Sequence, residues 1–294
     1  MGSTDKKSES RLTLYLLLAM AAWGLSWTNA KVLGFYADPP VIMVWRFIFA
    51  TLSFAPVVYF TNNTFKISLK NGMHILLGAI FITAYNYLFF KGTQVGLASV
   101  GGILVTTLNP IFTTLISALL LGGFLYRKDI WGLFFGFLGG LIILRFWEIQ
   151  SESFFQSGNI YFLLASVAWG ALTNVTAKGK DSISFMTYTF WRYVFSIVLS
   201  IGLARNSDLT TIFSYDWVFW LNMITISVLA MALATTTYFK GAVILGPKKV
   251  SSFIFTVPVT AVLFAMVFLG ESLEWPTILG GLLAGFAVYL INND

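Results

Sequence analysis

Aromatic rings inside long apolar runs are the first side chains of this 294-residue chain that could recognise a ligand. Trp23 and Trp27 are one helical turn apart and would share a helix face, and Trp169 and Thr173 repeat that spacing. Rings beside a few polar groups suit a solute that combines an apolar ring or chain with a polar head. These four residues are therefore predicted to line a substrate-binding site.

Amides and hydroxyls within three other apolar runs extend this candidate site. Tyr85 and Asn86 are adjacent, Asn109 precedes Pro110, and Tyr238 follows three threonines. Polar side chains in hydrocarbon are costly unless they find partners or face water, so they tend to point inward. We predict that Tyr85, Asn86, Asn109 and Tyr238 also bind substrate. The alternative is that they only form hydrogen bonds between helices.

Two arginines, Arg46 and Arg192, lie well inside apolar runs. A guanidinium at this depth could hold a substrate carboxylate through a bidentate contact. It could equally reach the lipid headgroups or brace a helix end by bonding to carbonyl groups. The symmetric placement of the two residues favours the structural role, and both interpretations stay open from the sequence.

The positions of the acidic residues favour some substrates over others. Every Asp and Glu lies in a terminus, a loop or the last turn of an apolar run, and none lies near the middle of one. Antiporters that exchange protons for lipophilic cations commonly keep a carboxylate at the membrane midplane. The pattern therefore favours neutral or zwitterionic solutes.

Enzyme chemistry finds almost no support in the sequence. The chain has no cysteine and one histidine, His74, and it contains no phosphate-binding loop, nucleotide fingerprint or serine triad. We therefore expect no catalytic residue, no metal site and no cofactor. A membrane-embedded enzyme is disfavoured for the same reason.

The elements that must position these side chains are membrane-spanning helices. Hydrophobic residues make up 57% of the chain and charged residues 10%, too few to cover a soluble globule. Ten runs can cross a hydrocarbon core about 30 Å thick. They lie near residues 12–34, 40–60, 72–92, 97–121, 128–147, 158–178, 183–204, 217–241, 247–270 and 275–292. Because none alternates in polarity, the predicted fold class is an all-α membrane protein with ten transmembrane helices.

The basic residues predict the orientation of the chain in the bilayer. With the N-terminus inside, the cytoplasmic gaps and adjoining helix ends hold 12 of the 18 Lys and Arg residues, and the opposite side holds four. The positive-inside rule therefore places both termini in the cytoplasm, which an even number of spans requires. Because these charges lie between apolar runs, the net charge of +6 indicates the lipid bilayer and not nucleic acid as the partner.

Short motifs recur along the chain at a nearly constant separation, 146 residues for the first two pairs. The pairs are Ala22-Trp23-Gly24 with Ala168-Trp169-Gly170, Trp45-Arg46-Phe47 with Trp191-Arg192-Tyr193, Phe90-Lys91-Gly92 with Phe239-Lys240-Gly241, Pro110 with Pro258, and Leu121-Gly122 with Leu269-Gly270. Residues 1–150 and 151–294 are thus predicted to be two five-helix repeats. An odd number of spans inverts the second repeat in the membrane, as in many secondary transporters.

These paired motifs resemble the ten-helix EamA-type members of the drug/metabolite transporter superfamily, from Leu12 to Ile291. A closing run also carries the resemblance: Pro258, Leu269-Gly270-Glu271, Gly280-Gly281 and Gly285. Gly123 stands where the first half might repeat Glu271, so the acidic position occurs once. Within the superfamily the sequence is most similar to bacterial inner-membrane exporters of amino acids, including exporters of aromatic amino acids.

The resemblance implies a secondary transporter of the inner membrane that moves small neutral or zwitterionic metabolites, above all amino acids, by alternating access. The alternatives are export of drugs or other metabolites, such as lipophilic cations or nucleotide-sugar-like solutes, and a channel. A nucleotide sugar would need a markedly basic cavity and a lipophilic cation an acidic one. The chain is expected to act as a monomer or a homodimer on a small-molecule substrate.

Glycines predict where helices approach closely. Gly132, Gly136 and Gly140 are spaced by four in the fifth run, and Gly281 and Gly285 repeat that spacing in the tenth. Such faces let helix backbones pack against each other. We expect this packing within one chain, and a homodimer seam is the alternative.

Two prolines and one glutamate carry further structural expectations. Pro110 and Pro258 are predicted to kink equivalent helices near their middles, because proline removes a backbone hydrogen bond, and the kinks would serve as pivots for a rocking motion. Glu271 lies between the ninth and tenth runs, where it is predicted to cap the N-terminus of the last helix.

Overall fold

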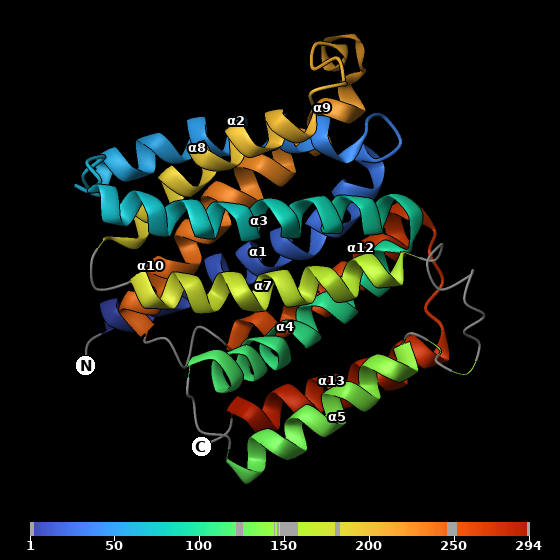
Figure 1. The fold of residues 1–294 in the computed structure, drawn as a ribbon. Coiled ribbons are helices and arrows are strands. Elements are labelled where there is room, and N and C mark those ends of the chain that lie inside the picture. The colour runs from blue at the N-terminus through green and yellow to red at the C-terminus, as the bar shows by residue number, and fades with distance from the viewer. Residues whose placement is uncertain are drawn as a thin grey trace.

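The computed structural model describes residues 3–121, 126–143, 145, 147, 158–179, 183–245 and 252–292. The described residues form helices joined by short connections, with no strand among them (Figure 1). The first half contains α1 (Ser3–Leu33), α2 (Pro39–Phe60), α3 (Leu69–Val95), α4 (Ala98–Leu121) and α5 (Arg127–Ile143). These bounds match the expected spans within a few residues, except that α1 begins earlier, in the polar segment at the N-terminus.

The second half repeats the five spans with one irregular member. Its helices are α7 (Asn159–Gly179), α8 (Phe185–Leu203), α9 (Trp217–Ile224), α10 (Thr235–Leu245), α12 (Thr256–Leu269) and α13 (Trp275–Asn292). The eighth span consists of α9, the π-helix η3 (Thr225–Ala234) and α10. A short 3₁₀ turn, η4 (Ser252–Phe255), leads into α12. The boundary predicted near residue 150 lies outside the described residues.

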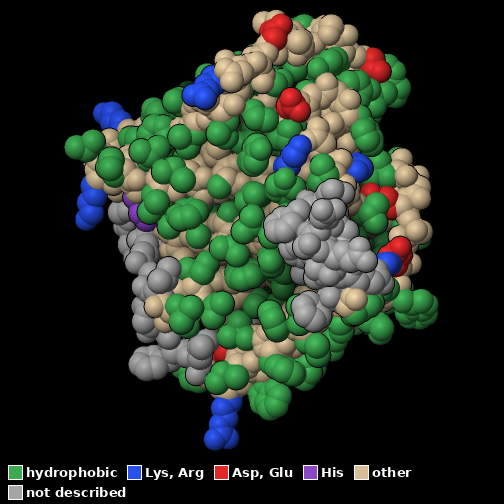
Figure 2. Space-filling view, turned by 45° about the vertical axis from the view of Figure 1, so that its right-hand side comes forward, with side chains coloured by type: hydrophobic (Ala, Val, Ile, Leu, Met, Phe, Trp, Pro, Cys, Tyr) green, Lys and Arg blue, Asp and Glu red, His purple; other side chains and the backbone are tan. Residues whose placement is uncertain are grey.

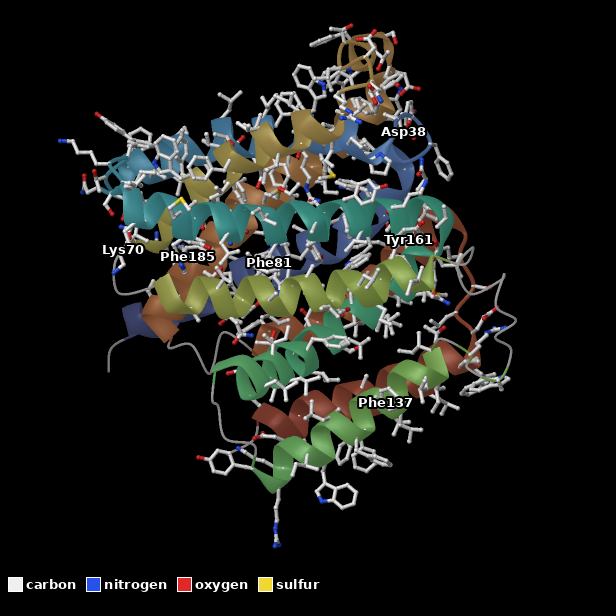
Figure 3. All side chains as sticks on the ribbon, viewed as in Figure 1. Asp38, Lys70, Phe81, Phe137, Tyr161 and Phe185 are labelled. Atoms are coloured by element: carbon white, nitrogen blue, oxygen red, sulfur yellow. The ribbon has the colours of Figure 1, made fainter. Side chains whose placement is uncertain are left out.

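The surface of the helical bundle is suited to lipid. By length and composition, five described helical stretches could cross a membrane: Pro39–Phe60, Leu69–Val95, Ala98–Leu119, Asn159–Ala177 and Trp217–Tyr238. Shorter apolar helices lie at Thr256–Leu269 and Trp275–Ala287. Hydrophobic side chains cover most of the visible face, and acidic side chains lie mainly toward one end (Figure 2). Lys70 and Asp38 mark opposite ends of the bundle (Figure 3).

The packing of the helices has the symmetry of an inverted repeat. α1 packs against α12 and η3, and with the halves exchanged α7 packs against α4 and α3. Each of α2, α4 and α5 packs against its own equivalent, α8, α12 and α13. The start of α1 and the end of α13 lie at the same end of the bundle (Figure 1). The predicted fold of two five-helix repeats is therefore confirmed.

A glycine contact joins α5 to α13, which lie together at the bottom of the view (Figure 1). A Cβ atom on Gly139 would lie 2.6 Å from the carbonyl oxygen of Gly280, so these two backbones touch. Gly136 instead accommodates Ile111 of α4, and nothing lies within 4 Å of a Cβ on Gly285. The close approach is thus inside the chain, as expected, but on α13 it is centred on Gly280 and not on the predicted pair.

The two prolines occupy different positions in their helices. Pro110 lies inside α4, as predicted. Pro258 is in the first turn of α12, directly after η4, and so is not near the middle of a regular helix. The first turn of a helix leaves backbone N–H groups without intrahelical partners, so proline costs little there. Pro258 therefore does not lie at the middle of a regular α-helix, and a kink at either proline stays a prediction.

Candidate functional site

Arg46 lies in the interior with two of its three guanidinium nitrogens hydrogen-bonded. Its side chain is 7% exposed. Nη1 donates to Oδ1 of Asn86 at 2.7 Å, and Nε lies 3.1 Å from Sδ of Met231. The guanidinium carbon is 5.4 Å and 5.2 Å from the ring centres of Phe89 and Phe90. Amide, thioether and aromatic faces thus stabilise this cation without a carboxylate.

Arg192 is the repeat partner of Arg46, but its surroundings differ. It is equally buried, and its guanidinium carbon lies 5.4 Å from the ring centre of Tyr188 and 5.7 Å from that of Tyr193. Its Nε has no hydrogen-bond partner among the described residues. The two arginines that sequence treats as equivalent are therefore not equivalent in structure.

Two Trp–Tyr pairs lie where one half meets the other. Trp23 of α1 is 5.4 Å from Tyr238 of α10, between ring centres, and Trp169 of α7 is 4.9 Å from Tyr85 of α3. The indole N–H of Trp23 also donates to the carbonyl oxygen of Ala230 in η3 at 3.0 Å. Four of the predicted site residues therefore form two Trp–Tyr pairs, each of which bridges the halves; the two tryptophans are repeat partners, whereas Tyr238 corresponds to Phe89 and not to Tyr85.

The other candidates are connected less directly to these pairs: Trp27 reaches Tyr85 through Phe89, whose ring stacks on that of Tyr85. Trp27 is 3% exposed and packs edge-on against Phe89 and Phe162. Thr173 is exposed and donates its hydroxyl to its own helix. Asn109 is partly buried in α4, and its Oδ1 has no partner among the described residues. The binding roles of all eight candidates stay predictions.

Hydrogen bonds tie each half to a loop of the other at both ends of the bundle. The indole N–H of Trp45 donates to the carbonyl oxygen of Leu209 at 2.9 Å, and that of Trp191 donates to Phe65 at 2.8 Å. The tryptophan of each Trp–Arg pair thus holds a loop. This role has a sequence signal, because both pairs stand at helix positions 146 residues apart.

A tyrosine–aspartate hydrogen bond is a second contact between the halves, at the same end of the bundle as Asp38. The Tyr36 hydroxyl donates to Oδ1 of Asp216 at 2.8 Å. This hydrogen bond lowers the pKa of the Asp216 carboxyl and raises the pKa of the Tyr36 hydroxyl. An acid with a lowered pKa stays ionised until the pH falls through that value, so the contact persists at neutral pH. A surface pocket of about 460 Å³ opens beside it, lined in part by Asp38 and Asp208.

Glu271 caps a different helix from the one predicted. Its carboxylate accepts the backbone N–H groups of Ala98 and Ser99, both at 2.8 Å, and the Ser99 hydroxyl at 2.5 Å. It therefore caps α4 of the first half and not α13. The physical reason is the inverted repeat, which places the start of α4 beside the end of α12. The turn there is made by Gly270, at φ +67°.

Several residues near the arginines were missed from sequence. η3, which supplies Met231 and Ala230, has no composition that distinguishes it from an ordinary α-helix. π-helical turns are rare and frequent at functional sites. Thr189, Ser196 and Ser200 on α8 were also missed, although their spacing places these buried residues on the helix face of Arg192, which the sequence did indicate.

The fold and these contacts define a multi-pass helical membrane protein built from two interlocked, inverted halves. No group of three or more potential metal-ligating side chains occurs in the described parts of the chain. The model of the EamA-like transporter family matches residues 11–145 and 156–293. The chain therefore belongs to the EamA-like transporter family. It is a secondary transporter with a small-molecule substrate, and it is not an enzyme.

Curated relatives agree with this family at low identity. An uncharacterized transporter of Bacillus subtilis, YyaM, is 28% identical over 211 residues, 68% of this chain and 69% of its own. A probable amino-acid metabolite efflux pump of Salmonella typhimurium is 26% identical over 294 residues, 93% and 92% of the two chains. An S-adenosylmethionine uptake transporter of Rickettsia bellii is 25% identical over 204 residues, 67% and 65% of the two chains.

A solved structure supports the same fold. One crystal structure, described only as that of a protein, superposes with a TM-score of 0.60 and covers 96% of both chains at 16% sequence identity. At that identity the likeness concerns the arrangement of helices alone.

Proposed function

We propose that this transporter carries α-amino acids, aromatic ones among them, or solutes that contain an α-amino acid group, across the bacterial inner membrane. The two halves would alternate access between the sides, with both termini in the cytoplasm. The α-amino acid group is the chemistry that two relatives share by name, since one moves amino-acid metabolites and the other S-adenosylmethionine. These relatives move their solutes in opposite directions, so the proposal concerns the solute and not its net direction.

The charge of the membrane interior is the observation that carries this proposal. α2, α3 and α8 contain two buried arginines and no Asp or Glu. A lipophilic cation would meet uncompensated positive charge there, and charges in a poorly polarisable interior interact strongly. A carboxylate-bearing zwitterion would instead neutralise that charge. Its apolar side chain would meet the aromatic pairs Trp23–Tyr238 and Tyr85–Trp169.

The ties between the halves support alternating access. Trp45 holds a loop at one end of the bundle and Trp191 holds a loop at the other. Opening one end requires its tie to break while the other tie persists, which is the behaviour expected of two inverted halves that rock about a shared site. The glycine contact between α5 and α13 is made within one chain, which is compatible with a monomer as the working unit.

Counterflow in liposomes tests the proposal. Vesicles that contain purified protein and excess unlabelled solute are given a trace of labelled solute, for each amino acid and for S-adenosylmethionine. A carrier accumulates label by exchange and a channel does not. We expect accumulation for at least one solute, strongest for an aromatic amino acid, with Trp23→Ala and Trp169→Ala lowering it. Exchange of lipophilic cations without any amino acid would refute the proposal.

A further inference from the structure

The equivalent helices α2 and α8 have buried faces of opposite character. Five buried residues of α2 are apolar: Ile42, Met43, Phe47, Ala50 and Phe54. The residues 146 positions later on α8 are also buried, but all are polar: Tyr188, Thr189, Tyr193, Ser196 and Ser200. Symmetry therefore does not explain the polar face of α8. The polar face is a feature specific to the second half.

The polar face of α8 is largely without hydrogen bonds. Tyr188 Oη, Thr189 Oγ1, Arg192 Nε, Ser196 Oγ and Ser200 Oγ have no partner among the described residues. Nearly all buried polar atoms in proteins have a partner, and groups without one demand an explanation. Here the unpartnered atoms line one side of a helix at intervals of three and four residues.

The part of this face around Arg192 converges on α3. A Cβ on Gly78 would overlap the Tyr188 hydroxyl and would lie 3.7 Å from Cδ of Arg192, so both side chains rest on that glycine. His74 stands one turn before Gly78, and its ring centre is 5.8 Å from that of Tyr188. The Nε2 of His74 is also buried and unpartnered. Three groups that can donate hydrogen bonds thus meet at one place.

Donors without an acidic neighbour make an anion site. α3 and α8 contain no Asp or Glu, and α2 beside them contains none. Arg46 is less suited to this role, because its Nη1 and Nε already donate to Asn86 and Met231. Of the two arginines, Arg192 alone has a buried donor left for a ligand among the described residues.

We propose that Arg192, with Tyr188 and His74, binds the carboxylate of the transported solute, and that Arg46 only positions Asn86 and η3. The inference rests on the proposed function, because it takes that anion to be part of the substrate. His74 lies in the second turn of α3 and Tyr188 in the first turn of α8, at the end of the bundle marked by Lys70 and Phe185 (Figure 3). The carboxylate would therefore be reached from the end that sequence assigns to the cytoplasm.

Three related probes separate the carboxylate from the rest of the ligand: L-phenylalanine, 3-phenylpropionate, which lacks the amino group, and phenethylamine, which lacks the carboxylate. Binding is measured by thermal shift of the purified protein and transport by counterflow. We expect the wild type to bind both carboxylates more tightly than the amine. Arg192→Gln should weaken both carboxylates roughly tenfold to a hundredfold, the range of one charge-assisted hydrogen bond, and leave the amine unchanged.

The chain offers matched controls for this experiment. Arg46→Gln makes the same change at the repeat-related position and should lower stability or turnover while the preference for carboxylates persists. Tyr188→Phe removes only an unpartnered hydroxyl, so it should not disturb folding, yet it should weaken carboxylate binding severalfold. Arg192→Lys keeps the charge without the fork of donors and should retain part of the affinity.

The outcomes separate this site from the transport proposal. If Arg192→Gln abolishes carboxylate binding but the wild-type protein exchanges no amino acid, the carboxylate site stands and the proposal of an amino-acid carrier is rejected. If the protein exchanges amino acids and neither Arg192→Gln nor Tyr188→Phe changes the KM of that exchange, the transport proposal stands and the carboxylate site is rejected. A carboxylate preference lost in Arg46→Gln and kept in Arg192→Gln would reverse the assignment, and so overturn it.

Discussion

Replacement of Glu271 by glutamine tests whether the two halves are joined at the start of α4. The carboxylate offers both oxygens as acceptors, one to Ala98 N–H and the other to Ser99 N–H and hydroxyl. A glutamine amide has the same shape but only one acceptor oxygen. At least one backbone N–H of α4 would lose its partner, and the negative charge at the helix N-terminus would disappear.

The magnitude follows from these two losses. An unsatisfied, partly buried N–H costs about 1–3 kcal/mol. Loss of the charge at a helix N-terminus costs about 0.3–1 kcal/mol. We expect Glu271→Gln to lower the free energy of unfolding by about 1.3–4 kcal/mol, the sum of the two losses. Titration of the detergent-solubilised protein with sodium dodecyl sulfate, followed by tryptophan fluorescence, measures this difference.

Glu274→Gln is the matched control, since it makes the same change three residues away. Glu274 forms an ion pair with Arg145, and both side chains are partly exposed. Exposed pairs contribute about 0–1 kcal/mol, so this variant should unfold close to wild type. If the two variants lost equal stability, or Glu271→Gln lost none, then the cap would not hold the halves together and the reasoning would fail.

Three further variants test the packing and the motion. Gly139→Ala should cost about 1–3 kcal/mol in thermal unfolding because its methyl group meets a backbone carbonyl, whereas Gly285→Ala, with open space around it, should be neutral or stabilising by about 1 kcal/mol. The chain contains no cysteine, so a Ser207→Cys variant carries a single reporter thiol in the loop that Trp45 contacts. In that background Trp45→Phe should raise the rate of labelling by a membrane-impermeant maleimide about fivefold, because one hydrogen bond to the loop is lost. An unchanged labelling rate would contradict the proposed tie. Pro110→Ala should lower turnover more than it raises KM, and equal turnover would exclude a pivot in α4.

The fold could be predicted from sequence because the bilayer imposes simple rules. Apolar length and the short gaps between runs determine the number of spans, and the paired motifs predict the inverted repeat. Each of these signals is local or repeats along the chain. The expected limits of the spans were therefore close to the observed helices, and the packing of equivalent helices followed from the symmetry.

Contacts between the halves could not be predicted in the same way. Glu271 lies only four residues before α13, and sequence proximity suggested that it caps that helix. Its actual partners, Ala98 and Ser99, are 173 and 172 residues away. The π-helix that carries Met231 had no signal because such a helix depends on tertiary contacts more than on composition. Long-range partners of polar side chains require the structure.

The sequence repeat suggested that Arg46 and Arg192 have the same role, and the structure gives them different surroundings. A duplicated Trp–Arg motif suggests a duplicated role, and for Trp45 and Trp191 that inference holds, since each donates to a loop of the other half. For Arg46 and Arg192 it does not hold, because their neighbours diverged. A rocking mechanism needs the two gates to be alike, whereas a solute that is not itself symmetric must be bound by unlike groups. Duplication is therefore expected to preserve the gates and to let the binding residues differ, and α2 and α8 follow that division.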